Sequence, residues 1–436
     1  MPGVSSGHLL GIFWASSKLL LDGALLCYKS ARMQFSTLRL KGRIYLDHNA
    51  TSPLAQSVSE LVPLWLESWG NPSSVHQAGR TPKTLLRESR EKIARMLGVN
   101  PLELIFTSGG SEANNLAVKG IFESFQKPEL FAREFRNHYL FSSVEHPSLN
   151  RVAEYLKSRG ARVDFIPVHR DGSIDLLAYE SLLTSETALV SVMLANNETG
   201  TIFPIKTMAA MAHAKGALFH SDCVQALGKI PVNLNELGVD LASFAGHKFY
   251  ALKGIGVLYA RRGLNLESLI HGGGQERHRR GGTENILAIA SLGHMCEMKD
   301  EVAERMTLVA ELRDHLESRI LAEICGVTLT ASESPRLPNT SSLVIPGVDG
   351  EILLMNLDMR GFAVSTGAAC SSGSPEPSPA LLAMGLSRAE AQSSLRVGLG
   401  WSTTWEEINL FVDTLKQVVS HLRQLDAREK EENVFC

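Results

Sequence analysis

The sequence of 436 residues has little cysteine and no excess of charge of either sign. The six cysteines, at positions 27, 223, 296, 325, 370 and 436, lack the C-x-x-C spacing of zinc sites and redox centres. They therefore predict neither a disulfide framework nor a bound metal, and they favour a reducing compartment. The net charge of −3 gives no reason to expect direct binding to nucleic acid or to a membrane surface.

Long uninterrupted apolar runs are also missing. Residues 9–28 are apolar, but Lys18 and Asp22 interrupt them, so the segment does not predict a membrane span. It also lacks the charged start and the small-residue cleavage site of a signal peptide. One interpretation of residues 1–32 is a weak transit peptide, for a mitochondrion or a plastid. We favour another, in which the protein starts at Met33 and is cytoplasmic.

From Arg43 onward, short apolar runs alternate with amphipathic stretches. The apolar runs predict buried strands at 102–106, 139–141, 163–168, 189–194, 217–220, 241–244 and 257–259. The amphipathic stretches predict helices at 81–97, 111–125, 148–158 and 206–215. This alternation is typical of an α/β protein with a mainly parallel sheet and helices on both faces, whose ligand site lies at the carboxyl ends of the strands.

The length of the chain and its 44% hydrophobic residues suffice for a large domain and a smaller one. We expect residues 1–42 to be an extension outside the fold, 43–300 to form the large domain and 301–436 a small α+β domain. The start of the large domain is expected to pack with the small one. A long helical stretch, 284–321, would link the two. The small domain is predicted to have strands at 327–329, 341–345 and 362–364 and helices at 351–358 and 405–423.

Two lone polar residues follow predicted strands of the large domain. Asp222 lies in His220-Ser-Asp-Cys-Val-Gln225, and Lys248 follows in Gly246-His-Lys248. A lysine amine can hold the aldehyde of pyridoxal phosphate as a Schiff base, while a carboxylate pairs with the protonated pyridine nitrogen and keeps the ring an electron sink. Either residue alone is more simply a surface side chain, but the two phrases in this order favour the cofactor.

Other polar residues lie where such a cofactor would need them. Gly110 and Ser111 open a predicted helix after a strand, which suits phosphate, although an ordinary glycine turn with a serine cap has the same pattern. His247 is a further phosphate candidate, although a solvated side chain is the simpler interpretation of this residue alone. His146 could stack on the ring and move protons, or simply cap a helix. Asn197, in an Asn-rich turn, could donate to the phenolic oxygen.

Gln225, three residues after Asp222, could reach the same phenolic oxygen, although a solvated side chain is the simpler interpretation. The Gly- and Arg-rich loop 271–283 favours phosphate contact over nucleic acid, because it is short, isolated and free of interleaved aromatic residues. The histidines at 220, 271 and 278 lack the spacing of metal ligands, so no metal is predicted.

A second group of candidates lies in the small domain. Cys370 is in a stretch rich in Ser, Gly and Pro, which indicates an exposed loop and suggests a reactive thiolate, with an incidental surface cysteine as the alternative. Arg396 is the one charged residue of an apolar strand, which favours a substrate carboxylate or a structural ion pair. The cysteines at 223, 296 and 325 are expected to be buried or half-buried.

Nine motifs in the right order resemble one family. Thr107-Ser-Gly-Gly-Ser-Glu112, Glu145-His-Pro147, Asn196-Asn-Glu-Thr-Gly200, the two phrases around Asp222 and Lys248, Gly272-Gly-Gly-Gln-Glu-Arg277, Gly282-Thr-Glu-Asn285, Cys370-Ser-Ser-Gly-Ser374 and Ser394-Leu-Arg396 are similar to those of the NifS/IscS cysteine desulfurases. These are group I enzymes of the class V aminotransferases, with the fold type I architecture of pyridoxal phosphate enzymes. The resemblance runs from about Ile44 to about Leu415 and implies a seven-stranded sheet.

The resemblance implies a role for each candidate. The ring of pyridoxal 5′-phosphate would contact Lys248, His146, Asp222, Asn197 and Gln225. Its phosphate would contact Gly110, Ser111 and His247, with Thr283 from the other subunit of a homodimer. Cys370 would take the sulfur of L-cysteine as a persulfide, leaving L-alanine, and pass it to an acceptor such as an iron–sulfur scaffold protein or a thiolation system. Arg396 and Asn197 would hold the substrate carboxylate.

The sequence departs from the family pattern at two positions. Ser111 replaces a frequent threonine and keeps the hydroxyl. Ala245 replaces a frequent phosphate-binding serine, so one hydrogen bond of about 1 kcal/mol is lost. Three other functions remain as alternatives: a selenocysteine lyase, a kynureninase-like or aminotransferase-like enzyme that would not need Cys370, and a non-catalytic scaffold that keeps the fold.

Overall fold

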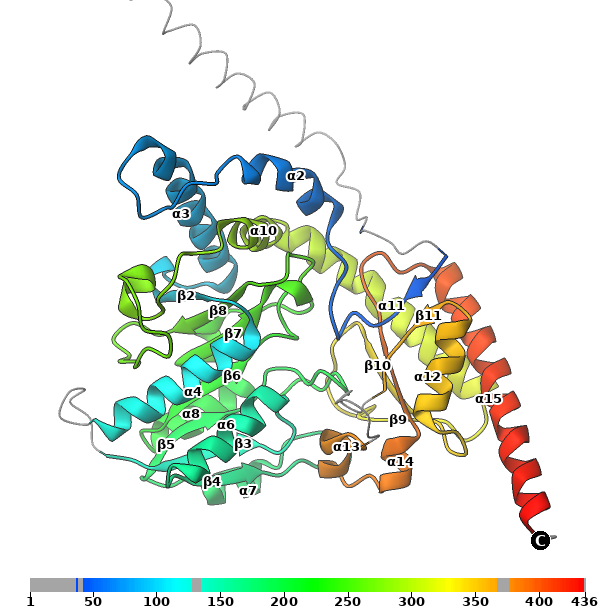
Figure 1. Ribbon diagram of the computed structural model, residues 1–436. Helices are drawn as coiled ribbons and strands as arrows, with labels where there is room; N and C mark the ends of the chain where they lie inside the picture. Colours follow the sequence, from blue (N-terminus) through cyan, green and yellow to red (C-terminus); the bar gives the residue numbers. More distant parts are fainter. Residues whose placement is uncertain (1–36, 38–41, 128–134, 367–375, 435–436) are drawn as a thin grey trace, which may run out of the picture. The chain divides into compact units, whose positions relative to one another are not determined.

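The computed structural model describes residue 37 and residues 42–127, 135–366 and 376–434 (Figure 1). The predicted extension, residues 1–42, therefore lies almost wholly outside the described residues. Cys370 is also outside them. Within the described part of the chain, no helix is both long enough and apolar enough to cross a membrane.

A seven-stranded sheet with the strand order β2-β8-β7-β6-β5-β3-β4 organises the larger part of the fold. Its strands are β2 (Leu104–Thr107), β3 (His138–Ser142), β4 (Arg162–Ile166), β5 (Thr187–Ser191), β6 (Leu218–Asp222), β7 (Leu241–Ala245) and β8 (Gly256–Ala260). Strands β3 to β7 pair in parallel, whereas β8 runs antiparallel to both β2 and β7. The predicted mainly parallel, seven-stranded α/β sheet is thus confirmed.

Helices cover the sheet, and two of them share its main core. The helices of this part are α2 (Gln56–Leu66), α3 (Gln77–Leu97), α4 (Gly110–Gln126), α6 (Pro147–Ser158), α7 (Leu176–Leu182), α8 (Ile205–Ala214), α9 (Leu234–Leu237) and α10 (Ile286–Glu297). Leu116 and Phe122 of α4 and Leu149 of α6 are buried together with Phe141 and Leu258 of the sheet. Most strands are buried along their whole length, and their sequences are accordingly mainly apolar.

A second, three-stranded antiparallel sheet has the order β12-β10-β9. Its strands are β9 (Thr328–Leu329), β10 (Thr340–Val344) and β12 (Ser394–Gly398), and the neighbouring helices are α11 (Lys299–Glu323), α12 (Gly350–Met359), α13 (Pro379–Ala383), α14 (Arg388–Gln392) and α15 (Trp405–Val434). The early strand β1 (Ile44–Tyr45) pairs in parallel with β11 (Phe362–Ala363), with Ile44 opposite Phe362. The start of the described chain is therefore joined to the C-terminal part of the fold.

Residues 284–321 are largely helical, as predicted. The chain forms two helices, α10 and α11, which are separated at Met298, where the backbone leaves helical geometry with φ −88° and ψ 18°. The reason is a change of packing partner. Helix α10 packs against α3 and α2, whereas α11 packs against α15 and β10. Met298 itself is buried at the junction.

Candidate active site

The two residues that favoured a cofactor in the sequence lie at one edge of the large sheet. Asp222 is the last residue of β6, and Lys248 ends a single 3-10 turn, η2 (Gly246–Lys248), that directly follows β7. Strands β6 and β7 are adjacent and parallel, with Asp222 opposite Ser243. Their carboxyl ends therefore meet, which is where ligands bind in sheets of this kind.

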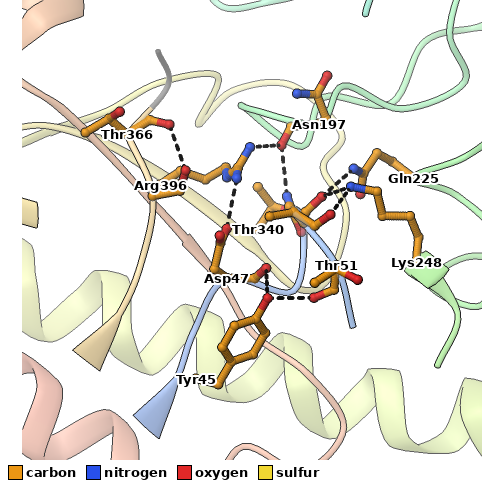
Figure 2. A network of polar contacts seen from close by, with 12 residues as sticks. Tyr45, Asp47, Thr51, Asn197, Gln225, Lys248, Thr340, Thr366 and Arg396 are labelled. Atoms are coloured by element: carbon orange, nitrogen blue, oxygen red, sulfur yellow. Dashed lines mark hydrogen bonds and ion pairs between the residues drawn. The ribbon is translucent and has the colours of Figure 1, made fainter. Parts of the chain in front are cut away.

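The Lys248 amine is held by main-chain carbonyl groups. Its Nζ donates to the carbonyl oxygens of Asn49 and Ala50, the latter at 2.6 Å (Figure 2). Burial, and then the positive charge of Arg396, lower its pKa to about 8, while the carboxylates of Asp47 and Asp222 act in the opposite direction. More of the amine is consequently in its neutral, nucleophilic form at neutral pH than for an ordinary lysine.

Asp222 is a buried carboxylate held by neutral donors. It is 6% exposed, its Oδ2 accepts from the Asn114 side chain at 2.7 Å, and its Oδ1 accepts from the main-chain N–H of Val224 at 2.9 Å. Within the residues that the structure describes, no lysine, arginine or histidine forms an ion pair with it. A buried carboxylate without a cation suits the protonated nitrogen of a pyridine ring.

His146 caps a helix, which is one of the two roles that the sequence offered as alternatives. It is the N-cap of α6, where its Nδ1 accepts the main-chain N–H of Ser148 at 3.1 Å. Because Nδ1 is an acceptor, the proton of the neutral ring lies on Nε2. Desolvation lowers the His146 pKa, the Asp222 carboxylate opposes this, and the Lys248 ammonium adds to it. The ring is therefore a neutral group within electrostatic range of both Asp222 and Lys248.

The phosphate candidates Gly110 and Ser111 are the first two residues of α4. A Cβ at position 110 would come within 2.8 Å of the Val224 side chain, so glycine is required there, and it would lie 3.5 Å from the Ala245 methyl group. A Cβ at Gly109 would meet nothing within 4 Å, so space is left in front of the helix. The free N–H groups of this first turn are suited to an anion.

His247 lies beside Lys248 and is tied to the N-terminal segment. Its Nδ1 is 3.1 Å from the Thr51 hydroxyl. Burial, Lys248 and Lys253 together lower its pKa to about 4. At neutral pH it is thus a neutral imidazole, which can donate a hydrogen bond to a phosphate but brings no positive charge.

Asn49 joins the parts of the site and was missed by the sequence interpretation. It is 1% exposed. Its side-chain Nδ2 donates to the Thr340 hydroxyl at 2.8 Å and to the Asn197 carbonyl at 3.1 Å, and its own carbonyl accepts from Gln225 Nε2 at 2.9 Å. An asparagine in a short turn gives no sequence signal for such contacts, since its partners come from distant parts of the chain.

Arg396 lies on β12 and points at the same network. Its Nη2 pairs with Asp47 Oδ1 at 2.9 Å, and its Nη1 donates to the main-chain carbonyl of Asn197 at 3.1 Å (Figure 2). The structural ion pair that the sequence left open is therefore present. The buried Nε has no hydrogen-bond partner among the described residues, so the guanidinium retains a donor for an additional anion.

The loop 271–283 is fixed at two points near α4. Glu276 is buried and forms a two-pronged ion pair with Arg90, at 2.5 and 3.0 Å, and Arg280 pairs with Glu112 of α4 at 2.8 Å. Thr283 is exposed and, with Ser108 and other residues, lines a cavity of about 180 Å³. The loop is thus held beside the first turn of α4.

The cysteines differ in accessibility. Cys223 and Cys296 are buried, and burial raises the pKa of both thiols, as is usual for structural cysteines. The expectation that Cys325 is buried or half-buried is wrong, because its short segment after α11 leaves it exposed. Cys370 lies outside the described residues. Among those that are described, no three histidine, cysteine or acidic side chains are grouped as a metal site would require.

The residues present fit pyridoxal phosphate. An amine with a lowered pKa, a buried carboxylate without a cation and a helix N-terminus with open space follow β7, β6 and β2, whose carboxyl ends lie at the same edge of the sheet. Each of these matches one part of the cofactor: the aldehyde, the ring nitrogen and the phosphate.

Comparisons with known proteins agree with this arrangement. Residues 44–411 match the Aminotransferase class-V family. A protein named cysteine desulfurase IscS from Dictyoglomus turgidum is 41% identical over 398 residues, which is 90% of this chain and 98% of the relative. A solved NifS-like protein has a TM-score of 0.81 at 35% identity, covering 87% of this chain and 100% of that one. The structure of SspA in complex with cysteine has a TM-score of 0.70 at 30% identity, covering 81% and 98%.

Proposed function

The chain belongs to the aminotransferase class-V family, among its cysteine desulfurases, and we propose that it uses pyridoxal phosphate to take the sulfur atom from L-cysteine, leaving L-alanine. The observation that carries this function is the meeting of Lys248 and Asp222 at the ends of two adjacent parallel strands. When bound, the cofactor supplies an electron sink for the electron pair left as the substrate Cα–H bond breaks.

The binding residues divide by the part of the cofactor that they face. Lys248 would hold the aldehyde and Asp222 the ring nitrogen, while Gln225 and Asn197 would face the phenolic oxygen. Gly110, Ser111 and His247 would bind the phosphate. His146 would stack on the ring. The contacts of Lys248, Asp222 and the first turn of α4 described above support these roles.

Arg396 would orient the substrate by its carboxylate. Its buried Nε has no partner in the described part of the chain, and Asp47 and the Asn197 carbonyl hold the other two nitrogens in one plane. A planar guanidinium fixed in this way binds a carboxylate with little further loss of side-chain entropy. The neutral Lys248 amine, or the His146 ring, would then move the Cα proton.

Cys370 would receive the sulfur. Its thiolate would attack the substrate sulfur, so that an S–S bond forms as the carbon–sulfur bond breaks, and the electron pair stays with the carbon that becomes alanine. Ser365 exchanges main-chain hydrogen bonds with Arg396 at 2.7 and 3.2 Å, and Thr366 follows it. Cys370 is four residues beyond Thr366, and four residues span at most about 14 Å. This length of chain permits the proposed attack, although Cys370 itself lies outside the described residues.

The persulfide would pass by thiol exchange to an acceptor protein, such as an iron–sulfur scaffold, or to a thiolation system. A homodimer would bring Thr283 of one subunit to the phosphate of the other, which the exposed position of Thr283 allows. The scattered cysteines support a reducing compartment, and we propose the cytoplasm. Fractionation of cells that produce the full chain tests this against a mitochondrion or plastid.

The direct test measures alanine and sulfide released from L-cysteine by the purified protein with a thiol reductant. We expect equal amounts from the wild type, and neither from Cys370→Ala, which should keep its cofactor colour. Cys325→Ala is the matched control, because Cys325 is exposed and its main-chain carbonyl is held by Arg423 of α15, which is not part of the network around Lys248. Persulfide formation on the Cys370→Ala protein would contradict the role of this residue. A coloured wild type that is inactive on L-cysteine would point to another substrate, selenocysteine first.

A further inference from the structure

A second buried lysine lies next to the candidate cofactor site and has no part in the function described above. Lys229 is 8% exposed. It follows Gly228, which has a φ of +73° and whose missing side chain leaves room for the Phe249 ring, beside Lys248. This close approach places the Lys229 side chain inside the network around Asn49.

Among the residues that the structure describes, Lys229 has two polar partners, and both are neutral. Its Nζ donates to Gln225 Oε1 at 2.6 Å and to Asn49 Oδ1 at 3.3 Å. No carboxylate forms an ion pair with it among the described residues. Burial, Lys248 and Arg396 together hold its pKa well below the usual range. A buried lysine without a carboxylate lowers stability, so a purely structural role would be met better by an apolar side chain.

Two contacts agree on which way the Gln225 amide faces. A lysine nitrogen that donates to Oε1 requires this end of the amide to be the oxygen. The other end is then the NH2 group, and Nε2 indeed donates to the Asn49 carbonyl at 2.9 Å. The same carbonyl accepts from Lys248 Nζ. The Gln225 N–H groups and the Lys248 amine therefore converge on one oxygen atom, so the donor end of the amide borders Lys248 (Figure 2).

We propose that Lys229 is a positioning residue of the cofactor site, which fixes the Gln225 amide so that its N–H, and not its oxygen, faces the phenolic oxygen of the cofactor. This inference rests on the proposed function in one respect, the place of Gln225 beside that oxygen. Without Lys229 the amide keeps only its hydrogen bond from Nε2 to the Asn49 carbonyl, so it turns more easily, and its oxygen would then repel the negative phenolic oxygen.

The test uses the full-length, cofactor-loaded protein and the pH at which its visible absorption band changes. A hydrogen bond to the phenolic oxygen stabilises negative charge there, which weakens its hold on the neighbouring imine proton. Lys229→Met removes the constraint on Gln225, so we expect the pH midpoint to rise by about one unit. The dissociation constant of pyridoxal phosphate should rise about tenfold by the same reasoning. Lys206→Met, at an exposed lysine, is the matched control and should change neither quantity.

A double substitution separates positioning from a direct effect of charge. If Lys229 acts through Gln225, Lys229→Met should shift the pH midpoint of the wild type. The same substitution in the Gln225→Ala protein should then cause less than about a third of this shift. An equal shift in both backgrounds would mean that Lys229 acts through its charge and would overturn the proposal, as would no shift in the wild type.

Lys229→Gln is the second variant, and it covers the event that the methionine variant does not fold. It keeps an N–H donor at this place, so its midpoint should stay within about half a unit of the wild type. A midpoint as high as that expected for Lys229→Met overturns the proposal. These readouts need bound cofactor but no turnover. If the proposed sulfur chemistry is wrong but this inference is right, the wild type will be inactive on L-cysteine, and Lys229→Met will still shift the pH midpoint of its absorption band.

Discussion

Asp47 and Arg396 are 349 residues apart in the sequence, and their side chains form an ion pair of 2.9 Å between Oδ1 and Nη2 (Figure 2). Both side chains are largely buried, and the pair connects the segment after β1 with the middle of β12. A buried guanidinium is costly without a partner, and Asp47 provides one while the guanidinium is without substrate. Asp47 thereby compensates the charge of Arg396 and keeps its guanidinium oriented for a second anion.

Replacement of Arg396 by methionine should therefore raise the KM for L-cysteine by about 100-fold, since a charge-assisted contact with the substrate carboxylate is lost. The absorption spectrum of the bound cofactor should stay unchanged. Steady-state kinetics and a cofactor titration measure the two effects.

Arg396→Met leaves Asp47 buried without its cation, which lowers the stability of the fold. The double variant Asp47→Asn with Arg396→Met should regain thermal stability without regaining a low KM. If the double variant recovered both, Arg396 would have no direct contact with the substrate.

The lowered pKa of Lys248 predicts a pH profile for cofactor binding by the apo-protein. Only the neutral amine attacks an aldehyde, so the rate of pyridoxal phosphate capture should rise with pH through a midpoint near 8. Absorbance after rapid mixing over a pH series measures this rate.

Variants of the neighbouring charges give the sign of each contribution. Arg396 lowers the Lys248 pKa and Asp47 raises it, so Arg396→Met should move the midpoint up and Asp47→Asn should move it down. A wild-type midpoint close to the 10.5 of an ordinary lysine would show that Lys248 is not desolvated in solution.

Ala245→Ser should strengthen cofactor binding. The Ala245 methyl group lies 3.5 Å from where a side chain at Gly110 would begin, at the first turn of α4. A hydroxyl there gains a hydrogen bond to the phosphate worth about 1 kcal/mol, or about fivefold in the dissociation constant.

Equilibrium dialysis of the apo-protein with pyridoxal phosphate measures the gain. Ala245→Cys, of similar size but a weak donor, is the control and should show little change. Weaker binding by the serine variant would mean that the hydroxyl is buried without a phosphate to reach.

Arg90→Met should release the loop 271–283. Arg90 and Glu276 form a buried, two-pronged ion pair, and Glu276 also accepts the main-chain N–H of Phe106 at 3.1 Å. Removal of one partner leaves the other charge buried, which costs about 3–5 kcal/mol. We expect a clearly lower melting temperature and weaker cofactor binding.

Arg151→Met is the control for this change, because Arg151 and Glu154 form an exposed pair on α6, and such pairs contribute about 0–1 kcal/mol. Similar melting temperatures for the Arg90 and Arg151 variants would show that the loop does not depend on its buried anchor.

Much of the fold could be predicted from the sequence because it is encoded locally. A strand buried on both faces is a continuous apolar run, and a helix after it shows an apolar stripe, so the seven strands and their mainly parallel order were within reach. Lys248 and Asp222 were found for the same reason, since a polar residue directly after a buried strand lies at the carboxyl edge of the sheet. What such patterns do not encode is which element a helix packs against, and the break at Met298 and the exposure of Cys325 were missed accordingly.

By itself, then, the sequence determined the seven strands of the large sheet, the longer helices around them and the residues at the ends of its strands, but not short helices such as α7 and α9. Only the tertiary structure decided that Asp47 pairs with Arg396, that Asn49 joins three parts of the chain, and that Lys229 orients Gln225. Periodicity reports on neighbours within a few residues, because backbone geometry repeats over that range. Contacts across hundreds of residues depend on how complete elements pack, and no local pattern of residues contains that information.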